Sequence, residues 1–323
     1  MAPVRLYSPV KVTERESRLE APVWDVVGIG ANSVDLVHLL PAAPQPSGPH
    51  AKQRIRRQLV SCGGQMTTTL ACVAGFGWRS KYIGATGDDE RGGILRAAMQ
   101  DRRVDMSSAL TKAGATNQFA VILVDESTGE RIVLWDRDER LALQPHEIPE
   151  DAIDGARLLH VDDVDQAAAI AAARRGRADG IPVTSDIDRL TDRTPELVAA
   201  VTIPIFAEHV PSALTGRADP EAALRALRRG HDGLLVVTLG TNGALALDGH
   251  RAIKSPAFHV DAIDTTGAGD VFRAGFIHGR LSGWPLEETL RFANAAAAVS
   301  CTRLGALAGV PSLADVETML ARG

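Results

Sequence analysis

Short apolar runs alternate along the chain with longer segments of helical period. The runs are rich in Val, Ile and Leu at nearly every position, whereas the segments between them repeat Ala, Leu and Arg at helical spacing. Strands that are apolar on both faces are typical of a parallel sheet covered by crossover helices. The sequence therefore predicts an α/β fold, with strands at 23–30, 80–87, 157–163, 181–188, 203–208 and 234–240 and helices at 89–103, 165–176 and 219–229.

Two segments interrupt this alternation. Residues 36–60 begin with a proline-rich stretch and end in an alternating run, and residues 116–136 hold two β-rich runs joined by DESTGE. A turn containing Gly between two such runs is the signature of a hairpin. We expect both segments to form a small sheet apart from the main one, within a domain that spans residues 23–323.

Composition narrows the class of protein. The 323 residues, 45% hydrophobic and 23% charged, suit one large or two smaller globular domains. The net charge of −5 supplies no positive field for nucleic acid or an anionic membrane, so small molecules are the expected partners.

The cysteines and the start of the chain indicate the compartment. Three cysteines without a CxxC pair favour a reducing environment over a disulfide framework. Residues 1–22 mix charge and proline with no apolar run of signal-peptide length, so we expect a loose tail there. No stretch of about 18 apolar residues occurs. These features predict a cytoplasmic protein.

The strongest candidate for chemistry is DTTGAGDVFRAGF, residues 264–276. Gly267, Ala268 and Gly269 leave consecutive backbone N–H groups uncovered just before a helix whose N-terminus attracts anions. Asp270 follows directly, where it could accept a proton from an attacking hydroxyl while the N–H groups hold a phosphoryl group. By itself the segment is equally consistent with an Asp that caps a helix after a glycine turn.

Other strand ends carry weaker candidates. Gly63 and Gly64, followed by Thr67 and Thr68, would let a polyol approach the backbone, although an ordinary loop-to-helix turn has the same pattern. Asp35 lies where a strand ends, free to accept hydrogen bonds from sugar hydroxyls.

A dinucleotide-binding oxidoreductase is an alternative of a different class. The GIGANS segment, residues 28–33, superficially matches the dinucleotide fingerprint, but Ser33 replaces its third Gly and no apolar helix follows. The chain also has no GxxxxGK[ST] phosphate loop, so a kinase of this sequence would use another fold.

Four motifs taken together and in order resemble the ribokinase family, the PfkB carbohydrate kinases. They are the helical run after Gly63 and Gly64, GDDERGG at 87–93, TLGTNG at 238–243 and DTTGAGD at 264–270. The segment FANAAAAVSCTRLGA at 292–306 strengthens the resemblance. The resemblance extends from about residue 23 to residue 311. It implies a doubly wound, mostly parallel α/β domain with a small β-sheet lid. It also implies a kinase that uses ATP and Mg²⁺ to phosphorylate a small sugar.

The resemblance implies a role for each matching residue. Asp270 would deprotonate the substrate hydroxyl, and Gly267, Ala268 and Gly269 would form the anion hole. Matches to sugar-contacting positions are Asp35, Gly64, Thr68 and Asp162, and matches to ATP-contacting positions are Thr238, Gly240, Gly243, Gly269 and Asn294. Matches to a monovalent cation site for K⁺, formed largely by backbone carbonyls, are Asp264, Thr266, Ser300, Arg303 and Gly305.

The chain differs from many relatives near the metal and the sugar. Ala207 and Val210 stand in place of an Asn-x-x-Glu pattern, with Glu208 as a candidate substitute. Ser33 and Thr68 replace two Asn residues that contact sugar, so the protein is not expected to be ribokinase itself.

These differences leave substrate and activity open. Gln65 occupies a position where a sugar phosphate would need a basic residue, and Arg137 and Arg140 are candidates for contacting an acidic sugar. A nucleoside kinase is an alternative that the aromatic content of 4% disfavours, because a base needs stacking partners. A sugar-binding pseudokinase is another alternative. The unpaired edges of a lid sheet would also suit a homodimer.

Overall fold

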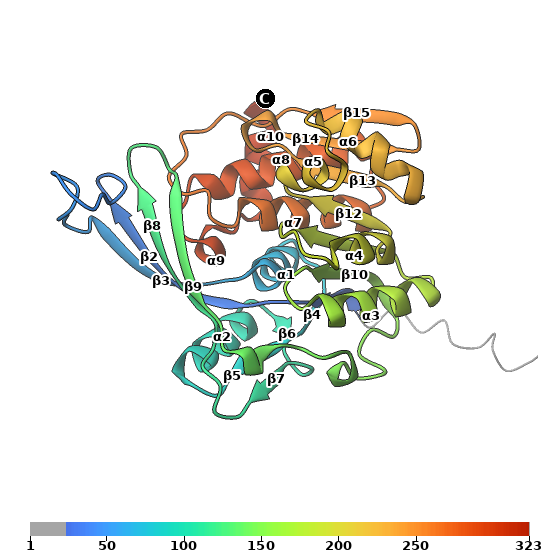
Figure 1. The fold of residues 1–323 in the computed structure, drawn as a ribbon, viewed down its shortest axis with the longest axis horizontal. Helices are drawn as coiled ribbons and strands as arrows, with labels where there is room; N and C mark the ends of the chain where they lie inside the picture. The colour runs from blue at the N-terminus through green and yellow to red at the C-terminus, as the bar shows by residue number, and fades with distance from the viewer. Residues whose placement is uncertain (1–23, 323) are drawn as a thin grey trace, which may run out of the picture.

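The computed structural model describes residues 24–322, which are built around a nine-stranded sheet (Figure 1). Its strand order is β15-β14-β13-β12-β11-β10-β1-β4-β6, and every pair is parallel except β13–β14 and β14–β15. The strands are β1 Trp24–Ile29, β4 Ser80–Ile83, β6 Val104–Asp105, β10 Ala156–Asp162, β11 Val183–Ile187, β12 Ile203–Phe206, β13 Leu235–Thr238, β14 Ala244–Asp248 and β15 Arg251–Ser255. The expected mostly parallel sheet is confirmed.

Helices cover both faces of this sheet (Figure 1). One face is covered by α3 Gln166–Ala178, α4 Thr194–Ala200, α5 His209–Thr215 and α6 Pro220–Leu227. The other is covered by α1 Gln65–Gly75, α7 Ala268–Leu281 and α8 Leu286–Cys301, with α2 Glu90–Asp101 and α10 Leu313–Arg322 packed beside them. Within residues 24–322, no helix combines the length and the apolar character needed to cross a membrane.

A separate four-stranded sheet, which we call the lid, projects from one side of this body (Figure 1). Its order is β3-β2-β8-β9, with β2 Ser33–Leu40, β3 Arg57–Gly63, β8 Phe119–Asp125 and β9 Arg131–Asp136. One face of the lid is apolar and includes Val37 of β2 and Ile122 of β8. Leu304 from the body packs against this face. The two segments that interrupt the αβ alternation therefore form the expected second sheet, including the β8–β9 hairpin.

Two strand expectations need correction. Residues 80–87 form not one strand but two, which are separated by Gly84. A Cβ on Gly84 would lie 2.5 Å from the carbonyl oxygen of Gly30. The second piece, β5 Ala85–Gly87, pairs with β7 Leu110–Lys112 outside both larger sheets. The second correction concerns the alternating run at 52–60, in which the strand begins only at Arg57. The tail expected at residues 1–22 lies outside the described residues.

The remaining elements are short and join these layers. They are α9 Ala306–Gly309 and four 3₁₀ turns, η1 Glu139–Leu141, η2 Pro145–Glu147, η3 Arg228–Gly230 and η4 Gly240–Asn242.

Helices α7 and α8 approach each other closely at a glycine. A Cβ on Gly275 of α7 would lie 2.8 Å from the Cα of Ala293 in α8, a distance that real Cβ atoms do not adopt. Gly93 of α2 also lies inside a helix, but no atom comes within 4 Å of its Cβ position.

Replacing these two glycines by alanine should have opposite effects. Gly275→Ala should lower the free energy of unfolding by ~1–3 kcal/mol, because the added methyl overpacks the helix contact. Gly93→Ala should raise it by ~0.5–1 kcal/mol, because Ala has the higher helix propensity. Urea denaturation measures both, and a stabilised Gly275→Ala protein would contradict the close approach of α7 and α8.

Candidate active site

A cleft of about 320 Å³ lies between the lid and the carboxyl ends of the main strands. This is where open parallel sheets place their ligands. The body contributes the ends of β11 and β13 and the starts of α1 and α7, and the lid contributes β2, β8 and β9. Predicted site residues among its lining are Asp35, Gly64, Thr238, Thr266, Gly267, Gly269 and Asp270.

The glycine loop before α7 has the geometry of an anion hole. Gly267 has φ +78°, in the left-handed region, and a Cβ there would also lie 2.9 Å from the Cβ of Ala306. Helix α7 begins at Ala268, so the N–H groups of its first turn have no intrahelical acceptor. These groups and the helix dipole favour a negatively charged ligand at this end of the cleft.

Asp270 lies in the first turn of α7 and lines the cleft. Burial is the main reason why its pKa rises to about 7, while the positive charge of Arg273 acts in the opposite direction. The side chain of Asp186 acts in the same direction as Arg273 on this pKa. A carboxylate whose pKa lies near neutrality can accept a proton at working pH and release it afterwards.

Two predicted sugar contacts, Asp35 and Gly64, meet in the cleft. The Asp35 Oδ1 atom accepts a 2.6 Å hydrogen bond from Ser33 Oγ, and burial raises the pKa of Asp35 to about 6. Gly63 must lack a side chain because its Cβ would lie 2.0 Å from Asp35 Oδ2. Gly64 has φ +96° and begins α1.

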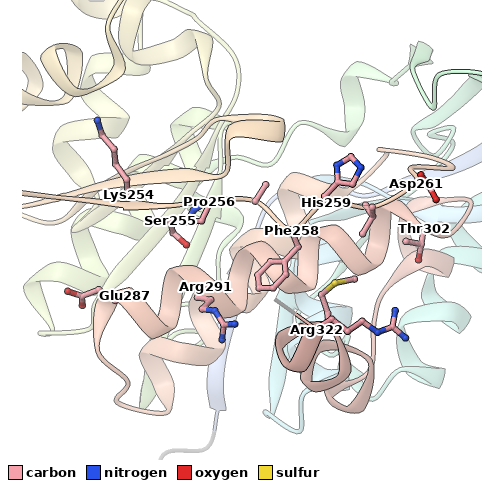
Figure 2. Close-up of a pocket in the computed structure, with 13 residues that line it drawn as sticks. Lys254, Ser255, Pro256, Phe258, His259, Asp261, Glu287, Arg291, Thr302 and Arg322 are labelled. Carbon is pink, nitrogen blue, oxygen red and sulfur yellow. The ribbon is translucent and has the colours of Figure 1, made fainter.

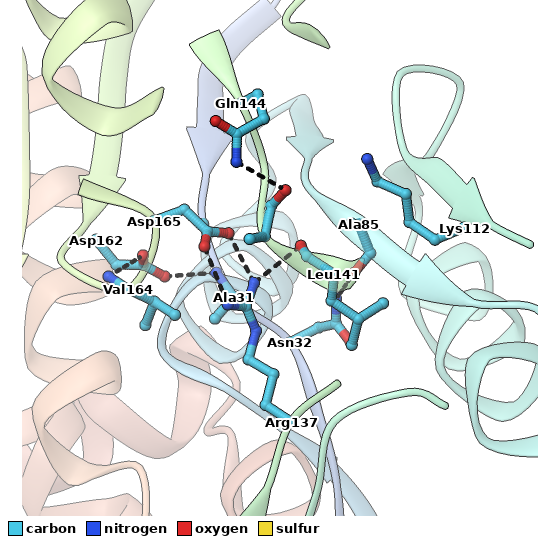
Figure 3. A network of polar contacts seen from close by, with 12 residues as sticks. Ala31, Asn32, Ala85, Lys112, Arg137, Leu141, Gln144, Asp162, Val164 and Asp165 are labelled. Atoms are coloured by element: carbon cyan, nitrogen blue, oxygen red, sulfur yellow. Dashed lines mark hydrogen bonds and ion pairs between the residues drawn. The ribbon is translucent and has the colours of Figure 1, made fainter. Parts of the chain in front are cut away.

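The other two predicted sugar contacts, Asp162 and Thr68, do not line the cleft. Asp162 is buried behind the loop that follows β1, where its carboxylate accepts hydrogen bonds from Ala31 N (2.6 Å) and Val164 N (3.1 Å) (Figure 3). Thr68 is fully buried, and its Cγ2 lies 3.5 Å from where a Cβ on Gly267 would be. In this structure both residues support loops of the site.

The predicted nucleotide positions surround one turn. Thr238 lines the cleft at the end of β13, and Gly240 and Gly243 bound the following turn with φ +53° and +86°. A Cβ on Gly243 would lie 2.1 Å from the carbonyl oxygen of Ser255. Asn294 of α8 donates to the same carbonyl at 3.0 Å. Asn294 therefore holds the end of β15 against α8, next to Gly243.

A second, larger cavity of about 840 Å³ lies beside this loop (Figure 2). Its lining includes Phe258, Arg291 and Arg322, and none of the predicted catalytic, nucleotide or sugar residues.

Three of the five predicted cation residues lie together. The Asp264 carboxylate accepts from Thr266 N and Gly305 N, both at 2.8 Å, and ties their loops to each other. The buried Thr266 Oγ1 has no hydrogen-bond partner among the described residues.

The side chains of the other two cation residues are used elsewhere. The Ser300 hydroxyl donates to Ala297 O, and Arg303 pairs with Asp315 at 2.9 Å. Residues 24–322 contain no cluster of three His, Cys, Asp or Glu side chains arranged to hold a metal.

Ala207 and Val210, which stand in place of Asn-x-x-Glu, have side chains without an oxygen atom to bind a metal. Ala207 lines the cleft, while Val210 is fully buried in the apolar core between α5 and the sheet. Glu208 is exposed and does not line the cleft, but the exposed Asp188 does. Mg²⁺ commonly uses one or two carboxylates together with substrate phosphates, so Asp188 fits this requirement where Glu208 does not.

The basic residues of the cleft are not those expected from the sequence. Arg137 pairs with Asp165 at 2.7 Å and Arg140 pairs with Asp138 at 2.5 Å, and neither lines the cleft. The arginines that line it are Arg131, Arg189 and Arg273.

Sequence reasoning also missed Asp186, Asp188 and Trp135, which line the same cleft. One signal was available for Asp186 and Arg273. Asp186 interrupts a buried apolar strand, and Arg273 lies three residues after Asp270 on the same side of its helix.

Comparisons with known proteins identify the family. The pattern of the pfkB family of carbohydrate kinases matches residues 25–313. The chain is 32% identical over 284 residues to the ATP-dependent ribose-1-phosphate kinase of Halopiger xanaduensis, covering 87% of this chain and 93% of the relative. It is 30% identical over 281 residues to the aminoimidazole riboside kinase of Salmonella typhimurium, covering 80% and 87%.

A solved structure shows the same fold. The ribokinase of Arabidopsis thaliana, complexed with ribose and ATP, superposes with a TM-score of 0.79 at 23% identity, covering 92% of this chain and 98% of that one. The chain belongs to the pfkB family of carbohydrate kinases. It has the ribokinase-like fold and is a phosphotransferase of the class that includes ribokinases, fructokinases and nucleoside kinases.

Proposed function

We propose that this protein transfers the γ-phosphoryl group of ATP, bound with Mg²⁺, to a hydroxyl of a small sugar. The observation that carries this proposal is the placement of Asp270 beside the Gly267–Gly269 loop in one cleft. Asp270 accepts the proton of the attacking hydroxyl as the new O–P bond forms. The N–H groups of the loop stabilise the charge that develops on the phosphoryl oxygens.

The nucleotide would lie along the turn that holds Thr238, Gly240 and Gly243. Mg²⁺ would be held by Asp188 together with the phosphates, and it would supply positive charge that offsets theirs. K⁺ would be held near Asp264, Thr266 and Gly305, where the unpartnered Thr266 Oγ1 and backbone carbonyls offer oxygen ligands. Its role there would be to stabilise the loop that forms the anion hole.

The geometry favours a sugar over the alternatives. Trp135 is the aromatic side chain among the described residues that line the cleft, and a nucleoside base needs stacking surfaces. A dinucleotide site needs a helix after the GIGANS turn, but β2 follows it and enters the lid. A pseudokinase would bind the same ligands without turnover.

Replacing Asp270 by Asn should abolish most turnover while leaving nucleotide binding intact. The amide keeps the shape of the side chain but accepts no proton, so kcat should fall by about 100-fold or more. ADP release measures turnover, and calorimetric titration with ATP measures binding.

Asp179→Asn is the matched control for this variant, because Asp179 is exposed at the end of α3, outside the cleft. If Asp270→Asn kept substantial turnover, Asp270 would not be the base.

A specific observation favours an anionic sugar, such as a sugar phosphate, within this proposal. The Arg131 Nη1 atom donates to Thr265 Oγ1 at 2.6 Å, and the Arg189 guanidinium lies 5.4 Å from the centre of the Trp135 ring. Each guanidinium has five N–H donors, so both retain donors for an anion in the cleft. The ribose-1-phosphate kinase relative is consistent with such an acceptor.

Arg189→Gln should discriminate between neutral and anionic acceptors. Loss of one charge-assisted contact should raise KM for a phosphorylated sugar by about tenfold or more and leave KM for the neutral sugar nearly unchanged. Steady-state kinetics with a neutral sugar and with its phosphorylated form measures both KM values. Equal KM changes for both acceptors would show that Arg189 does not bind the anionic group.

A second copy of this chain is the proposed partner of the lid. Ile132 and Leu134 of the outer strand β9, which do not line the cleft, are 42% and 56% exposed. An edge strand with unpaired backbone groups and apolar side chains is an association surface.

Ile132→Lys with Leu134→Lys should therefore convert a dimer into a monomer. In a dimer the two introduced lysines of each copy would be buried in the interface. They would lose their hydration and would repel the lysines of the other copy. Sedimentation velocity measures the mass, and a monomeric wild-type protein at micromolar concentration would contradict the lid interface.

A further inference from the structure

Asp163 is a buried acidic residue at the carboxyl end of the strands, next to the cleft but not among its lining. It follows β10 directly, as Asp188 and Arg189 follow β11. These two strands are parallel neighbours, with Asp162 paired in register with Asp186. Asp163 therefore lies beside residues 188–191, a segment that we call the β11 loop and that carries two lining residues into the cleft.

One oxygen of Asp163 holds the β11 loop through two backbone hydrogen bonds. Asp163 Oδ2 accepts from Asp188 N at 2.7 Å and from Arg189 N at 2.5 Å. An oxygen that accepts the N–H groups of two successive residues fixes the orientation of the backbone between them. The Asp163 side chain is 2% exposed, so it serves the loop backbone and is out of reach of a ligand in the cleft.

Neighbouring helices hold the rest of the β11 loop. Thr194 Oγ1 of α4 accepts from Thr191 N at 2.9 Å and donates to the carbonyl oxygen of Arg189 at 3.1 Å. Gln166 Oε1 of α3 accepts from Thr191 Oγ1 at 2.6 Å. Residues 188–190 are exposed and belong to no strand or helix. These contacts therefore determine where the loop lies.

Arg189 is held at both ends of its side chain. Its backbone N–H donates to Asp163, and its guanidinium lies 5.4 Å from the centre of the Trp135 ring in the lid. Both Arg189 and Trp135 line the cleft. Ordering a long side chain costs conformational entropy, so an arginine that is held in place beforehand binds a ligand at a lower cost.

We propose that Asp163 is a positioning residue for Arg189: by holding the β11 loop, it places the Arg189 guanidinium where the anionic group of the acceptor binds. This inference rests on the proposed function and its anionic acceptor. A negative charge near that group would repel it, so Asp163 does not assist binding through its charge. What the site needs from Asp163 is an oxygen that accepts two N–H donors.

Two replacements of Asp163 test which property matters. Asn keeps an oxygen that can accept both N–H groups, whereas Ala has none. Asp163→Asn should keep the Kd for a sugar phosphate within about twofold of the wild type, and Asp163→Ala should raise it by about fivefold or more, because Arg189 must then be ordered on binding. The Kd for the neutral sugar should stay nearly unchanged in both. An Asn variant that binds the sugar phosphate as weakly as the Ala variant would overturn the proposal.

Calorimetric titration measures each Kd. The probes are ribose 1-phosphate with ribose and tagatose 6-phosphate with tagatose, without ATP or Mg²⁺, so that Asp188 as a metal ligand has no part in the result. A wild type that binds neither sugar phosphate would overturn the proposal, because Arg189 would then meet no anion. If Asp163→Ala fails to fold, Asp163→Glu replaces it. The longer side chain keeps the charge but moves the oxygen, so sugar-phosphate binding should weaken, and wild-type binding by this variant would overturn the proposal.

A double variant distinguishes positioning from general damage to the cleft. If Asp163 acts through Arg189, Asp163→Ala should change the Kd for the sugar phosphate by less than about twofold once Arg189→Gln is present. The same fold-change in both backgrounds would show damage that does not pass through Arg189, and it would overturn the proposal.

Asp25→Ala is the matched control. Asp25 is also buried and also accepts a backbone N–H, from Arg79 at 2.9 Å, but it lies near the start of β1, at the end of the strands away from the cleft. Its replacement should leave the ratio of the two Kd values as in the wild type. A ratio changed as much as in Asp163→Ala would overturn the proposal, because loss of any buried Asp would then have the same effect.

Amide hydrogen exchange of the free protein, followed by NMR, separates failure of this inference from failure of the proposed function, because it needs neither acceptor nor turnover. The amide protons of Asp188 and Arg189 should exchange slowly in the wild type and in Asp163→Asn, and quickly in Asp163→Ala. Fast exchange in the wild type would overturn the two hydrogen bonds and with them the proposal. Slow exchange and selective loss of sugar-phosphate binding in Asp163→Ala, without ADP release for any acceptor, would support the positioning of Arg189 and overturn the proposed function.

Discussion

The site depends on the turn at Gly267, where the chain takes a left-handed conformation and enters α7 at once. Space as well as φ requires glycine there, since a Cβ would meet Ala306. This turn brings the free N–H groups of a helix N-terminus and the carboxyl of Asp270 into the same small volume. In the proposed function this single helical turn supplies both the anion hole and the base.

The rest of the fold holds this junction in place and closes it from the opposite side. The close contact of α7 with α8 at Gly275 fixes the helix, and Asp264 ties the preceding loop to Gly305. The chain leaves the main sheet after β1 and enters the lid as β2, which carries Asp35 into the cleft opposite α7. Body and lid are thus two walls of one site.

The sequence predicted the parts of this site that depend on local pattern. Apolar runs marked the parallel strands, the DESTGE turn marked the lid hairpin, and the DTTGAGD segment marked the glycine turn and Asp270 that line the cleft. Contacts between distant segments were not predictable from such patterns. The ion pair of Asp186 and Arg273 joins a strand to a helix. Arg137 was a candidate for binding an acidic sugar, but in the folded chain it forms an ion pair with Asp165. The strand break at Gly84 likewise lies beside the carbonyl oxygen of Gly30, a residue far from it in the sequence.

The most direct measurement of the central claim is ADP release from Mg-ATP, with and without K⁺, across a panel of acceptors. The panel comprises neutral sugars such as ribose and fructose, acidic sugars and sugar phosphates such as 2-keto-3-deoxygluconate and tagatose 6-phosphate, and the nucleosides adenosine and pseudouridine. The account predicts release with a sugar or sugar phosphate and little with the nucleosides. ATP and sugar binding without ADP release for any acceptor would contradict it and indicate a pseudokinase.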